Sequence, residues 1–234
     1  MGSLAAALKY LTIFPWPRRA ELPPAQVGRS SSFFPLVGLF LGLILLFFNW
    51  LLDPYLSSEI LSVLLVALLI VMTRALHLSG LRETFDARGD APYMAARGGG
   101  TLGLLSVIIV VALKFRAIEV LGEARNQGLL LAPVLGRWSI VVLSYGSASP
   151  GEGTARALVE EVRGMQLFIA TAIALLLVVP LSGRSGLWIA LWISFFALVC
   201  RSYFHRRSGG VTEDHCGAVE ELAEAIALTL FASF

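Results

Sequence analysis

Long apolar stretches separated by short polar segments make up most of this 234-residue chain. A membrane's hydrocarbon core is about 30 Å thick, and a helix that rises 1.5 Å per residue crosses it with about 20 apolar residues. Six stretches of about this length predict membrane-spanning helices at Phe33–Leu52, Ile60–Leu78, Thr101–Leu121, Gly128–Tyr145, Met165–Leu181 and Gly186–Phe204.

A seventh, weaker stretch, Gly217–Phe234, has Glu220, Glu221 and Glu224 near its start. It therefore either begins outside the lipid or buries these carboxylates inside the bundle.

The composition supports this interpretation, because 57% of the residues are hydrophobic and only 15% are charged. A typical soluble domain has about 45–50% and about 25%, respectively. The longest polar stretches, Ser79–Gly100 and Gly146–Gly164, are too short to form an independent core. We therefore predict an all-α polytopic membrane bundle of six to seven transmembrane helices, organised as one domain over residues 1–234, with Ser3–Phe14 as an interfacial or partly inserted helix.

The distribution of basic residues predicts the orientation in the membrane. The N-terminal segment and the loops after the second, fourth and sixth stretches hold eleven Lys and Arg residues, whereas the opposite loops hold only Arg125 and Arg184. We expect the chain to lie in the inner membrane of the cell. By the positive-inside rule, its N-terminus and long polar loops then face the cytoplasm. Because the basic residues form no continuous stripe, nucleic acid is excluded as a partner.

Several basic residues fall inside the apolar stretches, where a charge must either reach the interface or find a partner. We expect Lys114 and Arg116 to extend to the membrane surface. Arg137 and Arg201 are instead candidates for a function.

The first chemically dense segment follows the second apolar stretch. Glu83, Asp86 and Asp90 are spaced at i, i+3 and i+7, so a helix would place all three carboxylates on one face. Mg²⁺ suits such a face, because it binds one or two carboxylates and completes its octahedron with water and substrate phosphates. The alternative is a solvated face whose charge is balanced by Arg82 and Arg88.

The second dense segment precedes the last stretch. Gly209 and Gly210 allow the backbone to approach a ligand closely, and Thr212 can cap a helix whose first turn presents N–H groups to an anion. An ordinary capped helix start is the alternative. Gly217 lies on the same face as Asp214, where a small residue permits close helix contact in a membrane.

These segments, together with four shorter ones, resemble the cobalamin-5′-phosphate synthases, or adenosylcobinamide-GDP ribazoletransferases. The resemblance extends in order over nearly the whole chain. It is carried by Leu11–Pro17, Arg29 with Ser32–Leu39, Ala75–Leu78 with Gly80, Leu81, Thr84 and Asp86, Gly100–Gly103, Gly136–Trp138, and Gly209–Thr212 with Asp214, Gly217, Ala218, Glu221 and Glu224.

The resemblance implies a transferase that joins α-ribazole, or its 5′-phosphate, to adenosylcobinamide-GDP and releases GMP. It implies Mg²⁺ as the cofactor, Asp86, Asp214 and Glu83 as catalytic residues, and Glu83, Asp86, Asp90 and Asp214 as metal ligands. Other enzymes of cobalamin synthesis and a second copy of the chain are expected partners besides the lipid bilayer. The implied substrate-binding residues are Arg29, His77, Arg97, Arg137, Thr212, Gly209, Gly210, Glu221 and Glu224.

The chain departs from the family pattern at acidic positions. Where the family reads roughly ALHLDGLADTxDG, this sequence has Ser79 for the first Asp, Glu83 for the second and Ala87 for the final Gly. Either Glu83, Asp90 and Glu213 compensate, or the activity is altered. A non-catalytic membrane scaffold would explain the losses, and a small transporter would explain charges inside the apolar stretches.

We predict that a single cysteine placed at residue 88 reacts with a membrane-impermeant thiol reagent only from the cytoplasmic face. The reason is the excess of basic residues in the loops on that side. Labelling of single-cysteine variants in sealed inverted and right-side-out vesicles measures this. Reaction of residue 88 from the outer face would overturn the orientation.

Overall fold

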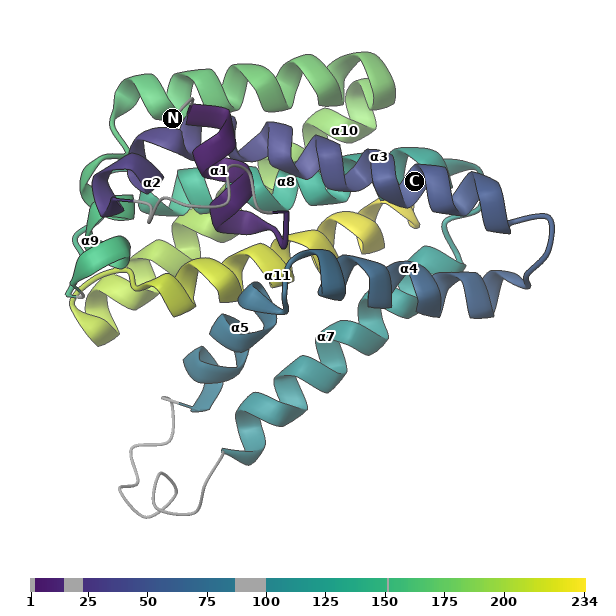
Figure 1. Ribbon diagram of the computed structural model, residues 1–234, viewed down its shortest axis with the longest axis horizontal. Helices are drawn as coiled ribbons and strands as arrows, with labels where there is room; N and C mark the ends of the chain where they lie inside the picture. Colours follow the sequence, from purple (N-terminus) through teal and green to yellow (C-terminus); the bar gives the residue numbers. More distant parts are fainter. Residues whose placement is uncertain (1–2, 15–22, 87–99, 151) are drawn as a thin grey trace.

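The computed structural model describes residues 3–14, 23–86, 100–150 and 152–234, and within them every regular element is a helix (Figure 1). The prediction of an all-α bundle is therefore confirmed. The elements are α1 (Ser3–Leu11), α2 (Pro24–Ser30), η1 (Ser31–Phe33), α3 (Phe34–Leu52), α4 (Ser58–Met72), α5 (Leu76–Asp86), α7 (Thr101–Glu119), η2 (Gly122–Ala124), α8 (Arg125–Ser144), α9 (Gly153–Glu160), α10 (Gly164–Ser208) and α11 (Glu213–Phe231).

Helix α8 forms the centre of the bundle, with α3, α10 and α11 packed around it (Figure 1). Every α8 residue from Gly128 to Ser144 is buried except Leu130, which is partly buried. Small residues allow α3 to approach closely, because a Cβ on Gly42 would lie 2.6 Å from the carbonyl oxygen of Leu130. A helix buried on all sides is expected to be apolar all round, which makes Arg137 within α8 conspicuous.

The continuous element α10 is a hairpin of two helices. Gly183 leaves helical geometry with φ 53° and ψ −130°. A Cβ on Gly186 would lie 3.1 Å from the carbonyl oxygen of Val178, a contact possible only where the chain reverses. Figure 1 shows the reversal, with the second half returning along the bundle. The predicted helices Met165–Leu181 and Gly186–Phe204 thus lie on either side of this turn.

The prediction of one helix over Ile60–Leu78 is wrong. Helix α4 ends at Met72, and α5 begins at Leu76 after a bend of 87°. Arg74 and Ala75 at the bend have φ values of 54° and 53°, a left-handed conformation that is uncommon and unfavourable for residues other than glycine. The bend directs α5 away from α4 and against α7 and α11.

The expected count of six to seven spans is not confirmed. Within the described residues, four helices are long and apolar enough to cross a membrane when the two halves of α10 are counted as one, or five if the bent α4–α5 pair is also taken as a span. Helix α11 is not among them, and its three glutamates are buried in the bundle, which decides between the two alternatives for the last apolar stretch. The cytoplasmic orientation stays a prediction.

Candidate functional site

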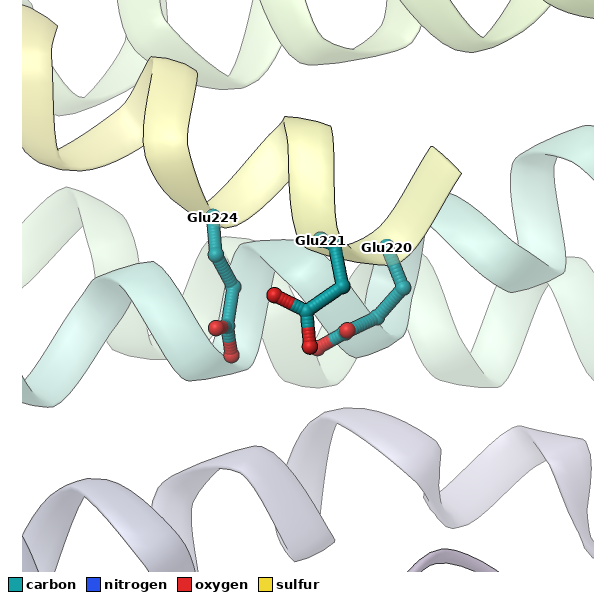
Figure 2. A group of neighbouring side chains, drawn as sticks. All are labelled: Glu220, Glu221 and Glu224. Carbon is teal, nitrogen blue, oxygen red and sulfur yellow. The ribbon is translucent and has the colours of Figure 1, made fainter. Parts of the chain in front are cut away.

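A cluster of five buried charges joins the three helices α7, α8 and α11. Glu220, Glu221 and Glu224 project from one side of α11 toward a common region (Figure 2), where Lys114 of α7 and Arg137 of α8 meet them. All five residues are buried, and Arg137 is only 1% exposed. We call these residues the ion cluster.

Short contacts connect every member of the ion cluster. Lys114 Nζ lies 2.5 Å from a carboxylate oxygen of Glu221 and 2.5 Å from one of Glu224. Arg137 contacts Glu224 as well, and its Nη1 lies 2.6 Å from Glu220. Removing these charges from water is expensive, so each must be paired inside the bundle. The expectation that Lys114 reaches the membrane surface is therefore wrong, because its ammonium group pairs with two carboxylates in the interior.

The three glutamates are also the one group of three in the described part of the chain whose oxygens lie close enough to share a metal ion. Lys114 and Arg137 already occupy the space between them and neutralise two of the three charges. We therefore assign the ion cluster a positioning role rather than a metal. His77 of α5 extends it, with Nδ1 3.9 Å from Glu220.

Glycines bring α5 against the beginning of α11. A Cβ on Gly80 would lie 2.8 Å from the carbonyl oxygen of Asp214, and one on Gly217 would lie 3.1 Å from the Cα of His77. The expectation of close helix contact at Gly217 is confirmed. This packing puts the two chemically dense segments of the sequence side by side.

A cavity of about 180 Å³ lies where these segments meet, and we call it the acidic cavity. Its polar lining comes from Tyr10, His77, Ser79, Glu213 and Asp214. The Tyr10 hydroxyl donates a hydrogen bond of 2.8 Å to Glu213. His77, implied by the family resemblance, is thus placed at a cavity together with Asp214.

Asp214 is a carboxylate with a perturbed pKa at the acidic cavity. Partial burial raises the pKa of Asp214, and the negative charges of Glu83 and Glu213 raise it further. Glu83 and Asp214 therefore lie near enough to interact. They come from distant segments of the sequence, and the family resemblance implied that they act together. Ionised carboxylates held close without a compensating cation are a feature of functional sites.

Asp86 has a structural contact one turn further along α5. Its carboxylate accepts a hydrogen bond of 2.7 Å from the Gly103 N–H at the start of α7 and lies 3.6 Å from Arg82. Side chains at Gly100 and Gly103 would collide with this carboxylate, which explains both glycines of the Gly100–Gly103 segment. Glu83, Asp86 and Asp214 do not form a group with closely spaced ligand atoms in the described residues, so their joint binding of one ion stays a prediction.

The turn before α11 serves mainly to connect helices. Thr212 accepts a hydrogen bond from the His215 N–H, and the Thr212 N–H donates to His215 Nδ1. Burial lowers the pKa of His215 to about 4, so at neutral pH this nitrogen is free of a proton and can accept. Gly209 ends α10 with φ 72°, and Gly210 lies against the carbonyl of Ala148, where no Cβ fits. These contacts favour the ordinary capped start over an anion site.

Arg29, also implied by the resemblance, is not among the residues that line the cavity. Arg29 is largely exposed and pairs with Glu161 at 3.1 Å, at the contact between α2 and α9. Asp90 and Arg97 fall outside the described residues.

The sequence predicted no role in the site for three contributors: Lys114, Glu220 and Tyr10. An unpaired cation in one apolar stretch and surplus carboxylates in another were a signal that Lys114 and the glutamates of α11 could pair. Tyr10 had no such signal, because its role depends on α1 packing near the start of α11.

Comparison with known proteins adds a family. The cobalamin-5-phosphate synthase model matches residues 3–232. The adenosylcobinamide-GDP ribazoletransferase of Geotalea daltonii is 34% identical over 95% of this chain and 93% of its own length. Those of a Thermoanaerobacter species and of Pseudomonas savastanoi pv. phaseolicola are 32% and 35% identical, over 98% and 96% of this chain and 96% of each relative. No solved structure matches, and the scaffold and transporter alternatives are not favoured.

We predict that Lys114→Met destabilises the protein by about 3–5 kcal/mol, because it leaves Glu221 and Glu224 buried without their cation. The matched control is Arg116→Met, two residues away on the same helix. Arg116 is exposed and pairs with Glu119 one turn on, so its loss should change stability by no more than about 0.5 kcal/mol. Denaturant unfolding in detergent micelles measures both. Equal effects of the two substitutions would contradict the central role of the ion cluster.

Proposed function

This chain belongs to the cobalamin-5-phosphate synthase family, and on that premise we propose that it is a membrane transferase that joins α-ribazole, or its 5′-phosphate, to adenosylcobinamide-GDP. The products are GMP and adenosylcobalamin, or adenosylcobalamin 5′-phosphate. The observation that carries the proposal is the acidic cavity, because it gathers Ser79, His77 and Asp214 from the two family-like segments at one place.

The proposed reaction is phosphoryl transfer. A ribazole hydroxyl oxygen forms a bond to the phosphorus attached to cobinamide, the anhydride bond to the second phosphorus breaks, and GMP leaves with the bridging oxygen. The hydroxyl proton must pass to a base. In such reactions, positioning and neutralising the charge of the phosphoryl oxygens supply most of the acceleration.

Asp214, which lines the acidic cavity, and Glu83, whose charge acts on it, fit a divalent cation. Asp214 and Glu83 form no ion pair with any described residue, and the raised pKa of Asp214 reflects burial next to like charges. Asp214 and Glu83 would hold Mg²⁺, with Asp86 one turn away on α5. When bound, Mg²⁺ supplies positive charge to the phosphoryl oxygens and orients them.

The ion cluster and the glycine contacts position the residues that line the acidic cavity. The ion cluster holds α11 against α7 and α8, and the Gly80 and Gly217 contacts hold α5 against α11, so Asp214 and His77 face one cavity. Ser79 lines the same cavity and offers a hydroxyl where the family pattern has a carboxylate. Asp214, whose pKa is raised, is suited to accept the hydroxyl proton or to bind the cation.

We predict that Asp214→Asn lowers GMP release by at least about 100-fold without lowering the melting temperature. Because the pKa of Asp214 is raised in the folded protein, the folded state binds a proton more tightly than the unfolded state, and its stability falls as pH rises through that pKa. A neutral Asn removes this penalty at pH 7.

The assay follows GMP release by the purified protein in lipid with adenosylcobinamide-GDP, α-ribazole and Mg²⁺. Asp53→Asn, at an exposed carboxylate just after α3, is the matched control and should leave turnover unchanged. Full turnover in Asp214→Asn would reject the role given to Asp214, and no turnover in the wild-type chain would reject the proposed function.

We also predict that Ser79→Asp raises Mg²⁺-dependent turnover by on the order of ten-fold, whereas Asp86→Asn abolishes it. Glu83 has one methylene more than the Asp of the family pattern. This methylene displaces the carboxylate by about 1 Å, a shift that can cost about 100-fold in rate. An Asp at position 79 adds a third carboxylate at the cavity, next to Glu213 and Asp214. Ser79→Asn controls for size, and Mg²⁺ titration of the rate is the measurement. If Ser79→Asn raised turnover as much as Ser79→Asp, the added charge would not be the cause.

A further inference from the structure

A second cavity, of about 370 Å³, adjoins the acidic cavity and shares Tyr10, Leu76 and Glu213 with it. It lies between the end of α1 and the bend that separates α4 from α5. Its other lining residues include the cations Lys9 and Arg74, and we call it the basic cavity. Its volume falls in the range of small-molecule sites, about 300–1,000 Å³.

The two cations come from separate segments that a backbone hydrogen bond ties together. The Ile13 N–H, just after α1, donates to the carbonyl of Met72 at the end of α4, at 2.7 Å. This contact places the chain that carries Lys9 beside the bend that carries Arg74. The basic cavity is therefore built by tertiary structure rather than by one flexible loop.

The bend at Arg74 is strained. Arg74 and Ala75 both have positive φ values, which neither residue type adopts readily. Such strain persists where the surrounding structure enforces it, and it concentrates at ligand sites. Arg74 is exposed and forms no ion pair with the described residues, so its guanidinium can receive an anion.

Aromatic rings line the same cavity. Phe14 packs edge-on against Phe40 with centroids 5.4 Å apart, and Tyr10 stacks with Phe34 at 6.1 Å. These contacts hold the two rings in place. A fixed ring beside two cations is a combination that suits a nucleotide, whose base stacks while its phosphates pair with the cations.

We propose that the basic cavity binds the guanosine diphosphate portion of the activated substrate, with Lys9 and Arg74 pairing with its phosphate oxygens. This inference rests on the proposed function and names a subsite for it. Because the two cavities share Tyr10 and Glu213, a diphosphate on Lys9 and Arg74 ends beside Asp214 and Ser79. The anhydride bond that breaks then lies at the boundary between the cationic and acidic walls.

Binding of GDP to the full chain in phosphatidylcholine nanodiscs tests the subsite. Arg74→Gln and Lys9→Gln should each raise the Kd for GDP by about ten-fold or more, because each removes a charge-assisted contact. Arg74→Lys should weaken binding less. Arg116→Gln, an exposed arginine on α7 outside both cavities, is the matched control and should bind as the wild type does.

Arg74→Gly separates a binding role from a structural one. Glycine adopts the positive φ at position 74 without strain, so this variant should unfold at a higher temperature than the wild type. If Arg74 binds phosphate, the same variant binds GDP about ten-fold more weakly despite its greater stability. Undiminished GDP affinity in Arg74→Gly and Lys9→Gln overturns the proposal.

Turnover distinguishes failure of this inference from failure of the proposed function. In the GMP-release assay, Arg74→Gln should raise KM for adenosylcobinamide-GDP by about ten-fold with little change in kcat. An active wild-type enzyme whose KM is unaffected by Arg74→Gln rejects the subsite and keeps the function. GDP binding that depends on Arg74 in a chain without transferase activity keeps the subsite and rejects the function.

An anionic lipid headgroup shares the phosphate chemistry, and lipid composition separates the two sources. GDP should bind in pure phosphatidylcholine, and phosphatidylglycerol should not displace it at equimolar amounts. Binding of phosphatidylglycerol that depends on Arg74, without any GDP binding, would assign the cavity to lipid and overturn the proposal.

Discussion

The pairing of three glutamates with two cations inside the bundle is the constraint on which the rest of this structure depends. Glu220, Glu221 and Glu224 lie on an apolar helix, and burying them without Lys114 and Arg137 would leave bare charges in a medium that solvates them poorly. The pairing therefore favours the rotational arrangement of helices α7, α8 and α11 that brings these side chains together. Apolar packing alone would distinguish such arrangements weakly, because lipid tails solvate apolar side chains as well as a neighbouring helix does.

The position of α11 determines the candidate site. With its glutamates turned toward α7 and α8, the first turn of α11 lies against α5, and Gly80 and Gly217 allow the two backbones to approach. Asp214 then meets Glu83 and the acidic cavity. The raised pKa of Asp214 indicates that this arrangement opposes stability locally, and the ion cluster nearby helps to hold it in place. Strain of this kind is common where structure serves chemistry.

The bend between α4 and α5 adds the second half of the site. The chain turns by 87° after Met72, and at this bend Arg74 lines the same cavity as Lys9 of α1. The strained residues Arg74 and Ala75 bring Lys9, Tyr10 and Glu213 into one neighbourhood. A substrate that carries a diphosphate and reacts near carboxylates fits such a pair of walls, since anion and cation can each find a partner within a short distance.

The sequence by itself determined the helical class, the approximate helix bounds, the Thr212 cap and the small-residue contact at Gly217, because hydropathy and capping are local properties of the chain. The family resemblance directed attention to Asp214, Glu83 and His77, which the fold brings close together. Only the tertiary structure decided that the apolar stretch Ile60–Leu78 bends at Arg74, since hydropathy runs through the bend unchanged. It also decided that Lys114 is paired inside, with carboxylates 107 and 110 residues away, and that Tyr10 reaches Glu213. Hydropathy reports how each residue partitions into lipid, whereas the partner of a buried charge depends on which helices pack together.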